Sequence, residues 1–250
     1  MALMKIIYTI WLREIKRFLR EKPRIIGNLA TPFMWFILMG IGLSSVTTLG
    51  SNYLGFVLPG VIGMSILFTS IFSGVSVIYD KQFGFLKEIL VAPVPRSSIV
   101  LGKVAGSATI SIINGIIILV LGTAMGVVQI NSLGQIFGAI LVMGLISFSF
   151  VSIGIAIASR LSSMEGFQVI MSFIVMPLFM LSGTFFPLDS VPAWMKYISI
   201  VDPLMYGVDG LRSLLLGTSE FPLYVDLFVL GTFSAMMILI STYLFGKINE

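Results

Sequence analysis

The sequence predicts an all-α polytopic membrane protein, because two long tracts of the 250-residue chain carry no charged side chain. Residues 25–79 and 104–159 contain no Asp, Glu, Lys or Arg. A helix rises about 1.5 Å per residue and the hydrocarbon core of a bilayer is about 30 Å thick, so about 20 apolar residues cross it once. Each tract is therefore long enough to cross twice.

Composition supports the same fold class. The mean hydropathy is +1.07, 57% of the residues are hydrophobic and only 10% are charged, as is typical of helical membrane proteins. The chain contains no cysteine and no histidine. These absences exclude disulfides, Cys/His metal sites and histidine acid/base catalysis. We therefore expect no metal site and no catalytic residues on this chain.

Six membrane-spanning helices are expected, within a single membrane domain over residues 1–250. Polar residues such as Asn52 and Asn131, and the segment from Asp80 to Ser98, mark the breaks between them. The expected spans are 25–46, 54–79, 99–127, 135–158, 166–185 and 223–246.

Lysine and arginine are sorted between the loops in a way that predicts cytoplasmic termini. Cytoplasmic loops of membrane proteins carry an excess of these residues. With the N-terminus inside, only Lys196 and Arg212 fall on the outer side. We therefore expect a multi-pass protein of the cell (cytoplasmic) membrane with both termini in the cytoplasm. The inner set is Lys5, Arg13, Lys16, Arg17, Arg20, Lys22, Arg24, Lys81, Lys87, Arg96, Lys103, Arg160 and Lys247.

Residues 1–24 predict an amphipathic helix that lies in the headgroup plane. Apolar residues recur at spacings of three and four from Met4 to Phe18, while basic residues form the opposite stripe. Arg17 and Glu21 are spaced to pair across one helical turn. An electrostatic membrane anchor and a contact with a partner protein both explain this pattern.

The segment 80–98, between the second and third spans, predicts a short amphipathic helix. Phe83, Leu86 and Leu90 fall on one face of this helix, and Pro93 and Pro95 end it. A simple turn between helices needs only about two to eight residues, so the added helix is typical of a surface offered to a cytosolic partner. A second interfacial anchor is the alternative.

Residues 186–222 are too apolar for a solvated loop and too often interrupted by Asp, Pro and Gly for a crossing. We expect two short helices that form a re-entrant or interfacial hairpin on the outer face, with Ser190 and Asp202 as candidate N-caps. Trp194, Tyr197 and Tyr206 are expected at headgroup depth, where aromatic rings with a polar atom are favoured.

Ion-coupling and nucleotide-binding chemistry are both missing. No ionisable residue is expected in the middle of a span, which argues against a proton- or sodium-driven carrier. Lys103, Arg160 and Glu165 lie near cytoplasmic span ends, where long side chains can reach the headgroups. The sequence has no Gly-x-x-x-x-Gly-Lys-Ser/Thr phosphate-binding loop. Any ATP must therefore be bound by another polypeptide.

Small residues and prolines mark further features of the spans. Small residues four apart predict close helix packing in lipid, and Pro32, Pro59 and Pro177 are expected to let their helices bend. The small-residue sets are Gly102/Gly106, Gly122/Gly126, Gly134/Gly138 and the row Ser65, Thr69, Ser73.

Two stretches of the chain are distinctive in sequence. The first is KEILVAPVPR, residues 87–96, followed by Gly102-Lys103. The second is LSGTFFPLD, residues 181–189, followed by Pro192-Ala193-Trp194, by Asp202-Pro203-Leu204 and by DGLR at residues 209–212. Together they resemble the permease subunit of ABC-2 type transporters, a family of drug, lipid and polysaccharide exporters. The resemblance covers nearly the whole chain and is nearest to the daunorubicin-resistance-like drug efflux branch.

The resemblance implies a dimer of permeases, either a homodimer or a heterodimer, that sits in the lipid bilayer and carries two separate ATPase subunits. ATP and Mg would be held by the ATPase subunit, with no cofactor on this chain, and no nucleic acid partner is expected. The family's first cytoplasmic loop is a coupling helix that seats in the ATPase. This assigns ATPase coupling to Phe83, Phe85, Leu86, Lys87, Glu88, Ile89 and Leu90.

The resemblance also implies a translocation path at the dimer interface, lined by parts of the first, second and fifth spans, and an outer gate formed by the re-entrant hairpin. The expected path residues are Met34, Phe36, Met64, Phe68, Phe173, Met176 and Met180. The expected outer-gate residues are Phe185, Phe186, Trp194, Asp202, Tyr206, Asp209 and Arg212.

The apolar path favours a hydrophobic or amphiphilic cargo, a drug or a lipid, because soft Met and Phe side chains adapt to variable apolar surfaces. Export of lipooligosaccharide or polysaccharide is the alternative within the family. A channel or scaffold without an ATPase is the alternative outside it. A membrane enzyme is disfavoured, because the sequence contains no acid/base constellation.

Overall fold

The computed structural model describes residues 2–44, 53–84, 94–188 and 191–248, and these residues form helices and connecting turns but no strand. The all-α fold predicted from the sequence is therefore confirmed. The helices are α1 (Ala2–Arg20), α2 (Lys22–Ser44), α3 (Tyr53–Phe72), α4 (Val75–Gln82), α6 (Arg96–Ala124), α7 (Leu133–Arg160), α8 (Met164–Ile170), the π-helical turn η2 (Met171–Val175), α9 (Met176–Leu181), α10 (Ala193–Val201), α11 (Pro203–Leu216) and α12 (Leu223–Gly246).

Five helical segments are long and apolar enough to cross a membrane, and α2 accounts for the remaining expected span with the shorter apolar stretch Ile25–Gly40. The chain is thus a multi-pass membrane protein. The second span continues through α4 to Gln82, beyond its expected end at residue 79, and keeps Asp80 and Lys81 helical. The five segments are Tyr53–Gln82, Arg96–Ala124, Leu133–Arg160, Met164–Leu181 and Leu223–Gly246.

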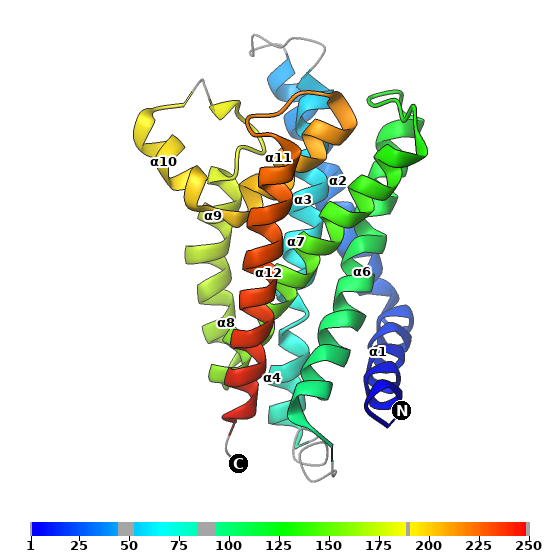
Figure 1. Cartoon of the computed structure of the whole chain (residues 1–250), viewed down its shortest axis with the longest axis vertical. Helices are drawn as coiled ribbons and strands as arrows, with labels where there is room; N and C mark the ends of the chain where they lie inside the picture. The colour runs from blue at the N-terminus through cyan, green and yellow to red at the C-terminus, as the bar shows by residue number, and fades with distance from the viewer. Residues whose placement is uncertain (1, 45–52, 85–93, 189–190, 249–250) are drawn as a thin grey trace.

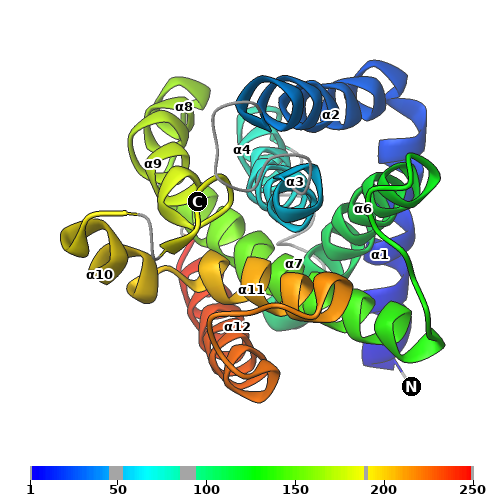
Figure 2. The same ribbon diagram turned by 90° about the horizontal axis from the view of Figure 1, so that it is seen from above.

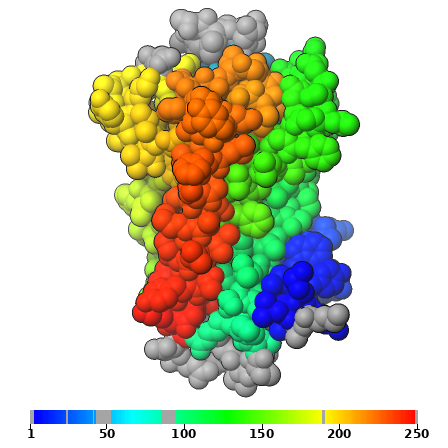
Figure 3. Space-filling model, viewed as in Figure 1, coloured from blue at the N-terminus to red at the C-terminus, as the bar shows by residue number. Residues whose placement is uncertain are grey.

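Helix α3 lies at the centre of the bundle, and α2, α6, α7 and α11 pack around it (Figure 2). Both ends of the chain lie at one end of the bundle, which we call the terminal end, whereas α10 and α11 lie at the opposite, far end (Figure 1). The most apolar window of the α3–α4 segment is 83% buried, against 17% for that of α12. Helix α3 is therefore the core helix, and α12 lies on the outside (Figure 3).

The amphipathic N-terminal helix is confirmed as α1, which packs along α6. The indole Nε1 of Trp11 donates a hydrogen bond to Thr109 Oγ1 of α6 at 3.1 Å. The predicted pair between Arg17 and Glu21 is also present, at 3.1 Å. The inner face of α1 is therefore held by the bundle, while Met4 at its start is exposed.

Glycines bring helix backbones into contact at two crossings. A Cβ added to Gly74, between α3 and α4, would fall on the carbonyl oxygen of Gly154 in α7, and one added to Gly154 would lie 2.5 Å from the carbonyl oxygen of Ile71. Cβ atoms at Gly102 and Gly106 of α6 would meet side chains of α1 at 2.7 and 2.8 Å. The close packing predicted at Gly102 and Gly106 is therefore confirmed.

In each of the other two glycine pairs, Gly122/Gly126 and Gly134/Gly138, one member does not lie at a close helix contact. Gly126 has φ +72° and lies in the turn after α6, where a left-handed residue ends the helix. The nearest contact of a Cβ at Gly134 would be 3.7 Å away, which is ordinary van der Waals distance. Only Gly122 and Gly138 face close neighbours, the leucine side chains of Leu58 and Leu214.

Pro32 and Pro59 lie in the interior of their helices, whereas Pro177 lies in the first turn of α9, directly after a widened turn. Pro32 and Pro59 interrupt α2 and α3 without ending them. Pro177 follows η2, in which the N–H of Met176 bonds the carbonyl of Met171. Proline has no N–H to donate, and a π-helical turn is one way in which a helix accommodates an interrupted hydrogen-bond ladder. Bending at these sites stays a prediction.

Of the two far-end helices, α11 has a side-chain N-cap and α10 has none. Asp202 is the N-cap of α11, as predicted, because its Oδ1 accepts the N–H of Leu204 at 2.9 Å. Ser190, the other candidate cap, lies outside the described residues. Helix α10 begins at Ala193 and follows the extended backbone of Pro192.

Candidate functional site

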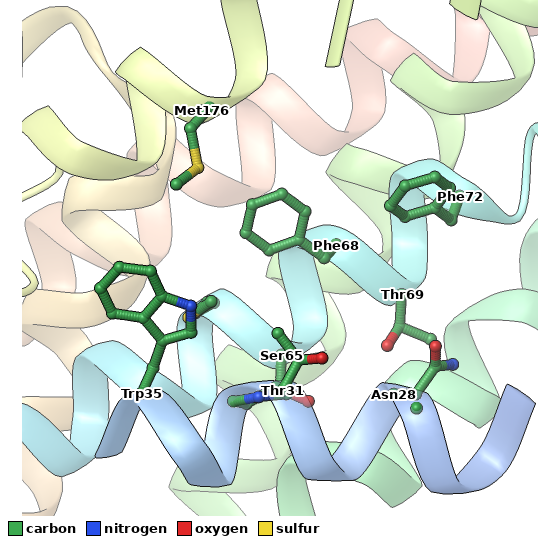
Figure 4. A pocket seen from close by; sticks show the side chains of 11 residues that line it. Asn28, Thr31, Trp35, Ser65, Phe68, Thr69, Phe72 and Met176 are labelled. Atoms are coloured by element: carbon green, nitrogen blue, oxygen red, sulfur yellow. The ribbon is translucent and has the colours of Figure 1, made fainter. Parts of the chain in front are cut away.

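A cavity of about 300 Å³ lies between α2, α3 and α9. Figure 4 shows polar side chains close to α2, with Phe68 and Met176 on the side away from it. None of the 11 lining residues is charged, whereas four carry a hydroxyl or an amide. The lining consists of Gly27, Asn28, Thr31, Pro32 and Trp35 of α2, Met64, Ser65, Phe68, Thr69 and Phe72 of α3, and Met176 of α9.

The seven expected path residues do not all meet in this cavity. Met64, Phe68 and Met176 line it. Phe36 is buried in the hydrophobic core instead, because it lies on the face of α2 that packs on the bundle. The other three are exposed on the surface: Met34, Phe173 and Met180.

A second cavity of about 380 Å³ shares part of its lining with the first and lies between α1, α2, α3, α4 and α8. Asn28 and Phe72 line both cavities. The ion pair of Arg17 and Glu21 and the ring of Tyr79 also line the second cavity. The second cavity is therefore charged, unlike the first, and two of its flanking helices, α1 and α4, lie at the terminal end of the bundle (Figure 1).

A buried charge cluster joins α1, α4 and α6 at the terminal end. Lys103 is 1% exposed, and its Nζ donates to Asp80 Oδ2 at 2.7 Å, to Glu14 Oε1 at 3.4 Å and to Ser76 Oγ at 3.3 Å. Arg13 contacts the other oxygen of Asp80 at 3.4 Å. We call these five residues the Lys103 cluster. The expectation that Lys103 reaches the headgroups is wrong, because carboxylates of α1 and α4 hold its ammonium inside.

The expected coupling segment, 80–98, is tied at both flanks to the ends of other helices. Lys81 Nζ donates to three carbonyl oxygens at the C-terminal end of α7, at 2.7 to 3.1 Å. Arg96 Nη1 donates to two carbonyl oxygens at the C-terminal end of α12. Cations are favoured at both places, because the last carbonyls of a helix have no helical partner and carry partial negative charge.

Phe83 is the expected ATPase-coupling residue that falls among the described residues. Its side chain is 79% exposed and its ring stacks on Tyr79, with 6.0 Å between the centroids. The other six lie outside the described residues: Phe85, Leu86, Lys87, Glu88, Ile89 and Leu90.

At the far end, the linker between α9 and α10 is tied to α3 and α11. The hydroxyl of Tyr53 donates to the carbonyl oxygen of Phe185 at 2.9 Å. Arg212 Nη2 donates to the carbonyl oxygen of Gly183 at 3.0 Å, and its guanidinium carbon lies 4.0 Å from the ring centroid of Phe56. Phe185 is buried. These contacts hold the linker against α3 and α11 at the far end.

Three expected outer-gate residues are buried at or after the start of α11. Asp202 caps the helix, and Asp209 accepts the N–H groups of Glu220 and Phe221 at 2.9 to 3.0 Å. Burial lowers the pKa of Arg212 to about 10, although Asp209 and Glu220 act in the opposite direction. The guanidinium therefore stays charged at neutral pH.

Tyr206 is not at the surface, contrary to the expectation of headgroup depth. Its side chain is 9% exposed, because its hydroxyl donates to the carbonyl oxygen of Ile200 at 2.8 Å and its ring stacks on Phe221 with 5.6 Å between centroids. Exposed aromatic side chains at this end include Trp194, Tyr197 and Phe186.

Comparison with known proteins identifies the family. A family model described as ABC-2 type transporter matches residues 6–216, which run from α1 to the end of α11. The chain belongs to the ABC-2 type transporter family. It is similar to the inner membrane transport permease YadH of Escherichia coli (strain K12), with 28% identity over 237 residues that cover 93% of this chain and 91% of YadH. It is also similar to nodulation protein J of Rhizobium meliloti (strain 1021), with 27% identity over 198 residues, 78% of this chain and 74% of that protein.

The part of this ABC-2 chain that matches the family contains both cavities, the Lys103 cluster and the far-end contacts of Arg212. The sequence did not lead us to predict the Lys103 cluster. Two features could have indicated it: Glu14 is an acid within a basic and apolar helix, and Asp80 lies at the end of an uncharged tract. Sequence reasoning also missed the two α2 residues Asn28 and Thr31, whose polar side chains stand out in an apolar span.

Replacing Lys103 by Met in this ABC-2 family member removes the cation that Asp80 and Glu14 share. Two buried carboxylates then lack their main partner, and we expect the free energy of unfolding to fall by about 3–5 kcal/mol. Denaturant titration of the detergent-solubilised chain measures this loss. Arg17→Met is the control, because its partly exposed pair with Glu21 contributes only about 0–1 kcal/mol. Equal losses in both variants would contradict the proposed stabilising role of the cluster.

Asp202 gives the stability of the chain a pH dependence. Burial raises the pKa of its carboxyl from 3.8 to about 7, while the hydrogen bond from Leu204 acts in the opposite direction. Between these pH values the unfolded chain has released the proton that the folded chain still holds, so stability falls as pH rises and levels off above about 7. Asp202→Asn keeps the cap oxygen but removes the titration. We expect melting temperatures to decline with pH in the wild type and to change less in the variant; the same slope in both would contradict this.

Proposed function

We propose that this chain is the permease subunit of an ATP-driven exporter, and that it forms the translocation path for a hydrophobic or amphiphilic drug or lipid. A separate ATPase subunit binds ATP and Mg in this proposal, because the sequence has no phosphate-binding loop. The observation that carries the proposal is the family match over residues 6–216. The similarity to a protein named as a transport permease supports it.

The coupling segment 80–98 is the surface that we assign to the ATPase. Lys81 ties its first flank to α7, Arg96 ties its second flank to α12, and Asp80 joins it to the Lys103 cluster. A displacement of the segment would therefore reach α1, α6, α7 and α12 together. The exposed ring of Phe83 supports the assignment, because it is a large apolar side chain left uncovered at the start of the segment.

A second permease copy, identical or related, completes the path in this proposal. Exposed apolar side chains lie on the two elements that flank the cavity, Met34 and Leu38 on α2 and Phe173 and Ile174 on η2. Packing of these faces against a second copy would place the cavity at the interface between the two permeases. This arrangement agrees with the path that the resemblance implies.

The terminal end is proposed to face the cytoplasm. Both ends of the chain lie there (Figure 1), together with most of the lysines and arginines, as the excess of positive charge in cytoplasmic loops requires. The exposed rings of Trp194 and Tyr197 then lie at the outer headgroups. The linker contacts of Phe185 and Arg212 form the outer closure of the path.

Replacing both Leu86 and Leu90 by Asp tests the assignment of the coupling segment. Burial of two carboxylates in an apolar groove of the ATPase is unfavourable. We expect the ATPase that co-purifies with the wild-type chain to be absent from the variant, and export of a fluorescent hydrophobic drug from cells to stop.

Leu133→Asp is the matched control, because Leu133 is an exposed leucine at the start of α7, at the far end. This variant keeps both the ATPase and export. A Leu86/Leu90 double variant that retains both activities would show that the coupling assignment is wrong.

A further inference from the structure

We propose that the cavity between α2, α3 and α9 binds an uncharged amphiphile whose head carries hydroxyl or ether oxygens, and that Ser65 is a specificity-determining residue for this ligand. The inference rests on the proposed function in one respect, since it assigns a chemical class to the cargo of the path. The binding site itself is argued from the cavity and does not require an ATPase.

Ser65 is the residue that points to a ligand. Its hydroxyl is buried, with 1% exposure, and it has no hydrogen-bond partner among the described residues. A serine in a helix commonly donates to a backbone carbonyl three or four residues earlier, as Ser111, Ser149 and Ser159 do here. A buried hydroxyl without a partner is unfavourable. A ligand oxygen in the cavity would supply the missing hydrogen bond.

The next hydroxyl along α3 is oriented by a buried amide. Asn114 of α6 donates from Nδ2 to Thr69 Oγ1 at 3.1 Å. This bond uses a lone pair of Thr69, so its hydroxyl proton remains to be donated, and no residue in the described ranges accepts it. Ser65 and Thr69 are four residues apart and lie on one face of the helix. They present two hydroxyls to the same cavity (Figure 4).

Helix α2 adds polar groups from the facing side. The amide of Asn28 and the hydroxyl of Thr31 line the cavity. Pro32 lies in the same helix and has no N–H, so the carbonyl of Asn28 loses the donor that a regular helix would provide. The seam between α2 and α3 thus offers both donors and acceptors, which suits a head with several hydroxyl or ether oxygens.

The charge of the ligand head follows from the rest of the lining. Trp35, Phe68, Phe72 and Met176 are apolar or aromatic, and none of the 11 lining residues carries a charge. A charged group in such surroundings lacks a counter-ion and is strongly disfavoured. The charged side chain of Arg17 lines the second cavity instead, where it pairs with Glu21. The uncharged cavity between α2, α3 and α9 therefore selects a neutral head over a cationic one.

The volume of the cavity limits the size of that head. About 300 Å³ lies at the lower end of the range for small-molecule sites, roughly 300–1,000 Å³. Such a space suits one ring with its substituents better than a chain of sugars. The aromatic side chains of Trp35 and Phe68 offer ring faces on which the apolar side of a sugar or another flat group can pack. The expected ligand is therefore a single-headed amphiphile.

Photolabelling of the full chain in phosphatidylcholine nanodiscs, without ATPase or nucleotide, tests the proposal. The probes are a diazirine-bearing dodecyl glucoside and a dodecyltrimethylammonium of the same chain length with the same diazirine. We expect the glucoside to label peptides from residues 27–35 and 64–72, and the cationic probe to label them about five- to tenfold less, as the loss of one or two hydrogen bonds implies. Methyl glucoside, which has no tail, should not compete.

Ser65→Ala should weaken labelling by the glucoside about five- to tenfold, and Ser65→Thr, which restores a hydroxyl, should recover it. Ser147→Ala is the matched control: Ser147 in α7 has another buried hydroxyl without a partner in the described residues, but it does not line the cavity. This variant should label like the wild type.

Three outcomes would overturn the proposal: equal labelling by the cationic probe, unchanged labelling of Ser65→Ala, or competition by methyl glucoside. Each is independent of the proposed exporter, because association with an ATPase and export of a drug are measured separately. A chain that binds the glucoside but recruits no ATPase would refute the exporter and leave the ligand class in place.

Discussion

The contact between Lys103 and Asp80, at 2.7 Å, is the interaction on which the rest of the structure depends. Lipid offers no water to solvate a buried ammonium, so this lysine must find carboxylates within the protein. Its partners are supplied by α1 and α4, which draws three helices together at the terminal end. A second set of buried charges, around Arg212, lies at the far end. The middle of the bundle is left uncharged, and the cavity lies there.

Helix α3 connects these two ends. Its first residue, Tyr53, bonds the carbonyl of Phe185 at the far end, while its continuation, α4, carries Asp80 into the Lys103 cluster. The cavity lies along the face of α3 between Met64 and Phe72. In the proposed exporter, a movement of the coupling segment therefore reaches the outer closure through the same helix that lines the cavity. The glycine contact between the α3–α4 junction and α7 makes that helix a tightly packed element.

The elements that the sequence predicted correctly are those set by local chemistry. Long uncharged tracts determine the spans, a side-chain oxygen before α11 determines its cap at Asp202, and spacing determines the pair of Arg17 and Glu21. What the sequence could not reveal depends on pairing between distant residues. Lys103 meets carboxylates 89 and 23 positions away, and Tyr206 is buried by a loop residue, Phe221. Hydrophobic periodicity indicates which face of a helix is buried but not which helix packs against that face. For this reason only three of the seven expected path residues line the cavity.

Sidedness of the coupling segment tests the central claim most directly, because an exporter driven by a cytosolic ATPase must present this segment to the cytosol. The chain has no cysteine, so single cysteines placed at the exposed residues Phe83 and Tyr224 report their side of the membrane without further changes. A membrane-impermeant maleimide is applied to intact cells and to inverted vesicles. The account predicts that Phe83→Cys reacts only in inverted vesicles and Tyr224→Cys only in intact cells. Labelling of Phe83→Cys from outside intact cells would contradict it.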